Sequence, residues 1–303
     1  MSRVAANSPV VEDDPDQRIH IVLDGSTVPI SVLLDGRAVR IIRDGVADWL
    51  TPVRRVDRIT CRGDVQWSTR ALLALADAGA PIGLVRRDGT LAAVVTGRME
   101  RRWGSLAEAL ARVARRPDFW TRVEDWRRGS VSRHARAIGI ADPAGAARLG
   151  WAAAEEAMVQ TSRVKPTAVA RRLARLAHTF AELLARRVLS DAGCPAKWLG
   201  TDGPAGGDLA VPFGQIALWR LVSLAASGRG AEALRRDMAN DAATVSGEPI
   251  PGREPLTGRA LHATGERAAP LLRRALARDI RHFHTFLVEL DVERRFGDRA
   301  RDG

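Results

Sequence analysis

The sequence predicts an α+β protein, with a small N-terminal β-sheet domain followed by a larger all-α, catalytic-type lobe. Short apolar runs separated by Asp-Gly pairs fill the first hundred residues, which is typical of strands and turns. The apolar period then becomes helical from Ser105 onward. At 303 residues and 46% hydrophobic composition, the chain is long enough to bury a substantial core. We predict a disordered N-terminus (1–16), a dimerising β domain (17–97), a helical domain (98–295) and a disordered tail (296–303).

The β domain is predicted from apolar runs in which hydrophobic and polar residues alternate. Asp24-Gly25, Asp35-Gly36 and Asp44-Gly45 lie between these runs, and we expect each pair to form a hairpin turn. Ser68 or Thr69 is expected to cap a short helix that ends near Gly79. The expected strands are Ile19 to Leu23, Val28 to Leu34, Val39 to Ile42, Val53 to Cys61, Pro81 to Val85 and Leu91 to Val95.

The helical lobe is predicted to begin at Ser105, which forms a capping box with Glu108. Pro166 is well placed in the first turn of a long helix. The Gly- and Pro-rich segment 244–257 is expected to be a loop. The expected helices are 105–116, 119–140, 144–160, 167–192, 208–226 and 268–295.

The charge of the chain favours a polyanionic partner. Lys and Arg total 47 against 36 Asp and Glu, a formal net charge of +11. All the basic residues except Lys165 and Lys197 are arginine, whose planar guanidinium suits phosphate oxygens. We therefore expect the protein to bind DNA.

The cysteine content and the N-terminal segment indicate a cytoplasmic protein. Cys61 and Cys194 lie far apart in sequence and have no zinc-ligand spacing. The first 17 residues are polar and acidic and lack an apolar stretch. No segment approaches the roughly 20 apolar residues that span a bilayer, so we expect no membrane association.

A glycine-rich loop, Gly193 to Phe213, contains the acidic residues that first suggest chemistry. Asp202 and Asp208 lie in this loop, where the backbone can approach a phosphate closely. Val211 lies three residues after Asp208, at the position where a second acidic ligand would complete a metal site. The loop therefore contains two acids that could contact a phosphate or a metal ion.

The order of these motifs resembles a known family. Residues Val56 to Val95 show a strand, a Gly-Asp-Val turn, a Ser/Thr-capped helix, Ala-Gly-Ala-Pro-Ile and an Asp-Gly-Thr-Leu hairpin. In this order they resemble the N-terminal domain of the CRISPR adaptation integrase, the CRISPR-associated endonuclease that inserts spacers. Gly129 to Gly139 and Pro166 to Leu199 resemble the family's arginine-bearing helix and its long central helix.

The resemblance implies a dimer that works with a small adaptation partner protein and joins DNA 3′ ends into a repeat array. It also implies Mg²⁺ or Mn²⁺ held by Glu, His and Asp, since hard cations prefer oxygen ligands. Asp208 matches the family's aspartate, but its histidine falls on Asp202. Its glutamate falls in a helix that offers Glu155 or Glu156. The resemblance thus implies a remodelled catalytic site of Glu155 or Glu156, Asp202 and Asp208.

Each of these acids also has a structural interpretation that needs no metal. Asp208 would cap the helix that follows it, and Asp202 would form an Asx turn beside Gly203. Glu155 and Glu156 face different sides of one helix, so at least one of them is expected to be solvated. The sequence does not choose between these alternatives.

The candidate DNA contacts are basic residues on two amphipathic helices and beside the loop. Few acids four residues away neutralise them, which favours phosphate contact, although solvated basic helix faces are common. His178 and His134 have no partner at ligand spacing and are expected to be structural. The candidates are Arg171, Arg172, Arg175, Lys197, Trp198, Arg273, Arg274 and Arg278.

Two functional hypotheses follow. The first is a divergent spacer integrase that cleaves or joins phosphodiester bonds with Mg²⁺ or Mn²⁺. The second is a catalytically inactive paralogue that binds DNA as a scaffold subunit, which the Val211 position and the missing histidine favour.

Overall fold

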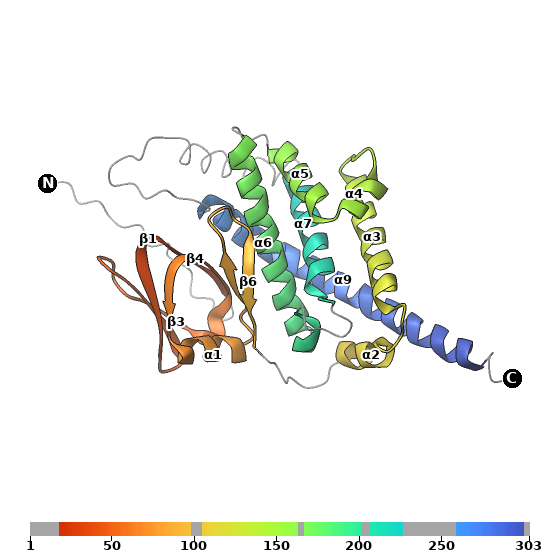
Figure 1. Cartoon of the computed structure of the whole chain (residues 1–303), viewed down its shortest axis with the longest axis horizontal. Helices are drawn as coiled ribbons and strands as arrows, with labels where there is room; N and C mark the ends of the chain where they lie inside the picture. Colours follow the sequence, from red (N-terminus) through yellow and green to blue (C-terminus); the bar gives the residue numbers. More distant parts are fainter. Residues whose placement is uncertain (1–17, 98–104, 163–166, 201–206, 227–258, 300–303) are drawn as a thin grey trace.

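The computed structural model describes residues 18–97, 105–162, 167–200, 207–226 and 259–299. Figure 1 shows a β-sheet at one end of the molecule, with helix α1 against it, and a group of helices at the other end. The long helix α9 runs across behind α6 and α7. The α+β fold predicted from the sequence is confirmed.

The sheet has six strands in the order β3-β2-β1-β4-β5-β6 and is mixed. Its central strand β1 pairs with β4 in parallel and with β2 in antiparallel orientation. Strand β5 is parallel to β4 and antiparallel to β6, so β3 and β6 form the two edges. The strands are β1 (Ile19–Asp35), β2 (Ala38–Arg43), β3 (Trp49–Pro52), β4 (Val56–Trp67), β5 (Ile82–Val85) and β6 (Leu91–Val95).

The expectation of a hairpin turn at Asp24-Gly25 is wrong, because both residues lie within the continuous strand β1. The β1–β4 register shifts between Gly25 and Ile30, which marks a bulge. A Cβ atom on Gly25 would lie 2.1 Å from the carbonyl oxygen of Asp64, so only glycine permits this close backbone approach. Gly25 thus allows β1 and β4 to pair closely and does not form a turn.

The other turn predictions hold. Gly36 joins β1 to β2 and Gly45 joins β2 to β3, both with positive φ angles (58° and 77°). Helix α1 (Thr69–Asp77) begins after Ser68, whose side chain accepts a hydrogen bond from the amide of Ala71.

The helical region contains α2 (Ser105–Val113), α3 (Phe119–Ala137), α4 (Pro143–Leu149), α5 (Trp151–Ser162), α6 (Thr167–Asp191), α7 (Ala210–Ala226) and α9 (Arg259–Arg299). The expected helix over 144–160 is two helices, separated at Gly150, whose φ is +60°. A Cβ there would lie 3.2 to 3.5 Å from the Gln215 side chain. Left-handed backbone ends α4, and α5 starts in a new direction.

Helices α6 and α7 form the centre of the helical core. Every residue of α7 from Pro212 to Trp219 is buried, so this helix is covered on all sides. Its Gly214 lies against the Cα of Glu182 on α6, where a Cβ would be 3.1 Å away, and against Trp151 of α5. The small residue therefore brings three helices together at one point, next to the cavity that holds the candidate site.

A buried ionic network connects the sheet to the helices. Asp57 of β4 is paired with its neighbour Arg58, with Arg273 of α9 and, at 3.7 Å, with Arg187 of α6. The Arg58 guanidinium also lies 4.4 Å from the centre of the Phe180 ring. Because three cations from different elements share one buried carboxylate, the sheet and the helices are held in a defined arrangement.

Candidate functional site

A cavity of about 390 Å³ lies between strand β6, helices α5 and α6, and the segment that leads into α7. Its polar lining combines carboxylates, an imidazole and guanidinium groups, which can transfer protons or form ion pairs. Residues 90–94 form the side of the cavity that belongs to the sheet. The charged or titratable side chains that line it are Glu155, Arg175, His178, Glu182, Arg186 and Asp208.

Most of these side chains form one continuous chain of contacts. Glu155 of α5 accepts a hydrogen bond from Nδ1 of His178 on α6 (2.7 Å), and the other ring nitrogen lies 3.8 Å from Glu182. The His178 ring stacks on Trp151, with centroids 3.6 Å apart and the planes 14° from parallel. Both the hydrogen bond and the stacking fix the orientation of the imidazole.

Arg186 completes the chain of contacts at its other end. Its Nη2 atom donates to Glu182 (2.7 Å) and to Asp208 (2.6 Å), and its Nη1 atom donates to the carbonyl oxygen of Leu199. The side chains of Arg186, Glu182 and Asp208 are 8%, 12% and 9% exposed. Charge-assisted hydrogen bonds in such a buried position hold all three side chains firmly.

Asp208 has the capping role that the sequence left open beside metal ligation. Its Oδ1 atom accepts a hydrogen bond from the amide of Ala210, the first residue of α7, while Oδ2 accepts from Arg186. The preceding Gly207 packs so closely on Trp120 that a Cβ would lie 2.0 Å from the indole ring. Tight packing of the loop thus places Asp208 at both the helix start and the cavity.

The structure distinguishes between the two candidate glutamates. Glu155 lines the cavity and contacts His178, whereas Glu156 is exposed and accepts a hydrogen bond from Gln160 on its own helix. Glu156 therefore has the solvated position expected of one member of the pair. Asp202 lies outside the described residues.

Glu182 and Asp208 are the carboxylates that come together in the cavity, and a divalent metal ion would have to bind between them. In the described part of the chain, no group of three His, Cys, Asp or Glu side chains is arranged to hold a metal ion. The point where Glu182 and Asp208 come together is occupied by the guanidinium of Arg186. As folded, these residues do not fit a divalent cation, because a positive group already neutralises the two carboxylates.

Neither cysteine is a candidate nucleophile. Burial raises the pKa of the Cys194 thiol, and the nearby Asp208 carboxylate raises it further. Burial also raises the pKa of Cys61 to about 11. Because the thiolate is the reactive form, both side chains stay protonated and unreactive at neutral pH.

The candidate DNA contacts fall into two groups in the structure. Arg273 pairs with Asp57, Arg175 with Asp88 at 3.0 Å, and burial together with the Arg62 charge lowers the pKa of Arg172. These three side chains are therefore engaged in or beside intramolecular contacts. The exposed residues are Arg171, Lys197, Arg274 and Arg278.

The expectation that Trp198 contacts DNA is corrected by its burial. Its side chain is 1% exposed and packs against the Phe119 and Trp120 rings, with centroids 5.4 and 6.0 Å away. A ring covered in this way has no free face for a base. The neighbouring Lys197 is exposed, so the two residues, adjacent in sequence, point in different directions.

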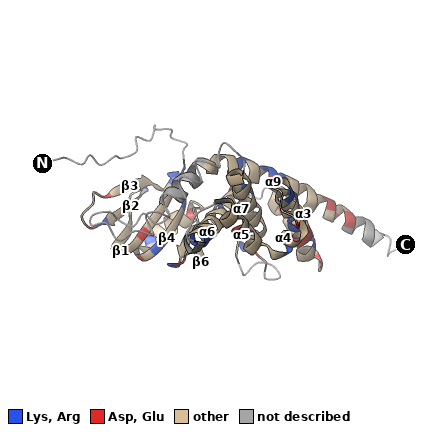
Figure 2. Cartoon of the chain, turned by 90° about the horizontal axis from the view of Figure 1, so that it is seen from above, with Lys and Arg blue, Asp and Glu red and all other residues tan. Residues whose placement is uncertain are grey.

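Basic residues lie on several elements in Figure 2, and α9 is one of them. Arg274, Arg278 and Arg281 recur at spacings of four and three residues on its exposed face. Among the described side chains, none that lines the cavity comes from α9. The basic face of α9 is thus a separate feature from the carboxylate cavity.

Sequence reasoning missed His178, Glu182 and Arg186 as members of the site. A signal was present, because the three residues recur every fourth position and so share one face of α6. The sequence did not reveal that this face meets Glu155 and Asp208, which lie on other elements.

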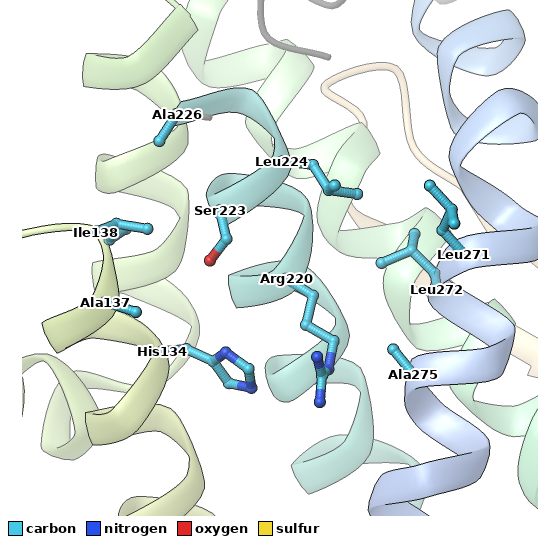
Figure 3. Close-up of a pocket in the computed structure, with 10 residues that line it drawn as sticks. All are labelled: His134, Ala137, Ile138, Arg220, Ser223, Leu224, Ala226, Leu271, Leu272 and Ala275. Carbon is cyan, nitrogen blue, oxygen red and sulfur yellow. The ribbon is translucent and has the colours of Figure 1, made fainter. Parts of the chain in front are cut away.

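A second cavity, of about 620 Å³, lies between α3, α7 and α9 and is mostly apolar (Figure 3). His134 and Arg220 supply charge-capable groups at its wall. Burial, with the charge of Arg220, lowers the pKa of His134 to about 4. The imidazole is therefore neutral at pH 7, consistent with the structural role expected for it.

Comparisons with known proteins give matches in structure only: no protein-family model and no curated protein sequence matches the chain. A Cas1 protein from Thermotoga maritima superposes with a TM-score of 0.56 at 11% identity, covering 89% of this chain and 97% of that one. A casposase bound to integration product gives a TM-score of 0.56 at 10% identity, covering 88% and 90%.

This chain has a Cas1-like fold. A third similar chain, from a Cas6-RT-Cas1–Cas2 complex, gives a TM-score of 0.53 at 13% identity, covering 90% of this chain and 35% of that one. The fold expected from the sequence resemblance is thereby confirmed. At such low identities the likeness establishes the fold alone.

Across the described ranges, none of the helices combines the length and the apolar character that a bilayer span requires.

Proposed function

We propose that this protein is a DNA-binding subunit of a spacer-acquisition machinery, and that it binds DNA without metal-dependent strand chemistry. The observation that carries the proposal is the ionic contact of Arg186 with Glu182 and Asp208. A metal-dependent nuclease leaves converging carboxylates open to a cation, which then binds the phosphate. Here an arginine of the chain itself already neutralises them.

The charge of the cavity supports the same conclusion. Three carboxylates, Glu155, Glu182 and Asp208, line it together with Arg175 and Arg186. Arg175 is also paired with Asp88, which reduces its attraction for an external anion. With no bound cation, this lining offers a DNA phosphate little net attraction.

DNA binding is supported by the +11 charge of the chain and by the exposed basic face of α9. Arginines that contact phosphates read no sequence, so we expect binding with little sequence preference and a strong dependence on salt. Exposed Lys197 and Arg171 are proposed as further phosphate contacts.

The test is to measure DNA binding by fluorescence anisotropy as a function of salt, for the wild type and for a variant with Arg274, Arg278 and Arg281 all changed to Ala. We expect the slope of log K against log salt to fall by about one unit for each phosphate-binding arginine removed. The matched control changes three exposed arginines of the sheet domain, Arg37, Arg54 and Arg87, to Ala. Equal weakening in both variants would refute a role of α9, and no DNA binding at low salt would refute the proposal.

A second candidate function, metal-dependent integration, is favoured by one observation: Glu155 and Asp208 line the same cavity. With Asp202 they would form the metal set implied by the family resemblance, with Mg²⁺ or Mn²⁺ as the ion. Incubation of half-site DNA with the protein separates the two candidates. Cleavage or joining that needs Mn²⁺, stops with EDTA and is abolished in Asp208→Asn supports the integrase, whereas binding without turnover supports the DNA-binding subunit.

We also propose that the protein is a homodimer formed through the β domain and that it assembles with a small Cas2-like partner. Edge strand β3 supports the dimer, because its Trp49 and Leu50 are 45% and 54% exposed. Sedimentation should show a dimer for the wild type and a monomer for Leu50→Glu. The control Leu149→Glu changes a similarly exposed leucine on a helix outside the sheet and should stay dimeric.

A further inference from the structure

Arg186 occupies an unusual position for an arginine in an ion pair. A single nitrogen atom, Nη2, lies within 2.7 Å of carboxylate oxygens from two different elements, Glu182 on α6 and Asp208 at the start of α7. The contact to the carbonyl oxygen of Leu199 fixes the other terminal nitrogen. The guanidinium therefore cannot turn outward without removing the cation from two largely buried carboxylates.

The geometry around Nη2 is that of a cation held between hard oxygen donors. Mg²⁺ and Mn²⁺ are commonly bound through one or two carboxylates, with water filling the other positions. Glu182 and Asp208 would supply such a pair, and the cavity beside them has a volume of about 390 Å³, enough for several water molecules. His178 and Glu155 line the same cavity.

We infer that Arg186 is a built-in cation that takes the place of a divalent metal ion between Glu182 and Asp208. The side chain keeps the carboxylates together, fixes the start of α7 and excludes metal from this position. It follows that the wild-type protein binds no divalent ion at these two carboxylates. Removal of the positive charge should convert the same position into a binding site for Mn²⁺ or Mg²⁺.

A metal-replacing arginine and an ordinary structural ion pair give different results when Arg186 is substituted. If Arg186 were only a stabilising partner, its removal would lower stability and nothing else. If it stands in for a metal ion, its removal creates an affinity that the wild type does not have. The inference needs no nucleic acid, so its failure can be distinguished from a failure of the proposed DNA-binding function.

The experiment is isothermal titration calorimetry with MnCl₂ and MgCl₂ on the full chain without DNA. We compare the wild type with Arg186→Gln, which removes the charge, and with Arg186→Lys, which keeps it. We expect one Mn²⁺ per chain for Arg186→Gln, at least about tenfold tighter than any wild-type binding, since ligand charge sets affinity at such sites. Arg186→Lys should bind no more Mn²⁺ than the wild type does.

Arg175→Gln is the matched control. Arg175 lines the same cavity, but its ion pair is with Asp88, outside the carboxylate pair. Its removal makes the cavity more negative without freeing two converging carboxylates, so no Mn²⁺ site should form. An equal gain of Mn²⁺ affinity in Arg175→Gln would show a general charge effect and overturn the inference.

A thermal-shift measurement keeps the test decisive if Arg186→Gln is only marginally folded. Mn²⁺ should raise the melting temperature of Arg186→Gln and should not raise that of the double variant Arg186→Gln/Asp208→Asn. Mn²⁺ binding by the wild type that is abolished in Asp208→Asn would overturn the inference. So would an Arg186→Gln variant that Mn²⁺ neither binds nor stabilises.

Discussion

Arg186 and Arg187 are neighbours on helix α6, both are almost fully buried, and they belong to two opposite kinds of ionic network. Arg187 contacts the carbonyl oxygen of Ala78 at 2.9 Å and lies near Asp57 and Asp191, so it helps to join the sheet to the helices. Arg186 lies in the cavity with Glu182 and Asp208. One residue step turns a helix by about 100°, which sends the two side chains to different surroundings.

The two networks differ in whether the anion or the cation is present in the smaller number. Around Asp57, three arginines share one carboxylate, so the acid is the critical member. Around Arg186, two carboxylates, Glu182 and Asp208, share one buried guanidinium, so the base is the critical member. A buried charge left without its partner is costly, so removing the scarce member should disturb each network most. Substitutions in and around the two networks test this rule.

The largest effect is expected for Asp57→Ala, which leaves Arg58, Arg187 and Arg273 without their shared anion. Removal of one partner from a buried ionic group costs about 3–5 kcal/mol, so we expect a decrease of that size in the free energy of unfolding. Chemical denaturation measures it. Asp48→Ala is the control, because the Asp48–Arg40 pair is exposed and its removal should cost less than about 1 kcal/mol. Similar costs for both variants would contradict the rule.

The same carboxylate predicts a dependence of stability on pH. Burial alone would raise the pKa of Asp57, but the charges of Arg58, Arg273 and Arg187 hold it below its ordinary value of 3.8. A lowered pKa in the folded state gives stability that is present above pH 3.8 and is lost as the pH falls below it. The difference between wild type and Asp57→Ala should therefore stay constant from about pH 7 to about pH 5 and shrink only in stronger acid.

A smaller cost, about 2–4 kcal/mol, is expected for Arg186→Ala, because Glu182 and Asp208 have some access to solvent and to water in the cavity. Denaturation at pH 7 without metal measures the cost. Added Mn²⁺ should recover part of it in Arg186→Ala and none of it in Asp57→Ala. Recovery in both variants would show that the ion acts elsewhere.

Gly207→Ala tests whether the packing of the loop positions Asp208 next to Arg186. A Cβ would overlap the Trp120 ring at 2.0 Å, so the loop must shift, at a cost of about 1–3 kcal/mol. Gly200→Ala is the matched control, because a Cβ on Gly200 would meet no atom of the described residues within 4 Å and its backbone is not left-handed. Thermal denaturation compares the two variants, and equal melting temperatures would contradict the packing argument.

The smallest effect concerns His134, which lies among cations at the second cavity. Burial and the charges of Arg220 and Arg133 lower its pKa to about 4, while Asp279 opposes them. Between these pH values His134 is protonated in the unfolded chain and neutral in the folded protein. The free energy of unfolding therefore falls as the pH drops from about 6.5 towards 4. After allowance for partial exposure we expect about 1–2 kcal/mol, which His134→Gln should remove from the pH profile.

Patterns within short segments were readable from the sequence. Asp35-Gly36 formed its turn and Ser68 capped its helix as expected, because backbone sterics and local hydrogen bonds decide both. Asp24-Gly25 has the same two residues as a turn, yet it lies inside β1, because parallel pairing with β4 outweighs the local preference. The division of one expected helix into two was likewise not predicted; it occurs at Gly150, which has a positive φ and packs against Gln215 of another helix.

The sequence by itself determined the α+β class and the basic charge of the chain, since these depend on periodicity and on composition along the chain. Its resemblance to a known family also pointed to Asp208 and to Glu155 or Glu156, but not to Glu182. Only the tertiary structure decided that Glu155 and not Glu156 faces the cavity, that Trp198 is buried, and that Arg186 neutralises Asp208. These outcomes depend on contacts between residues far apart in the chain. The direction in which a helix face points, and what it meets there, follow from packing of the whole molecule.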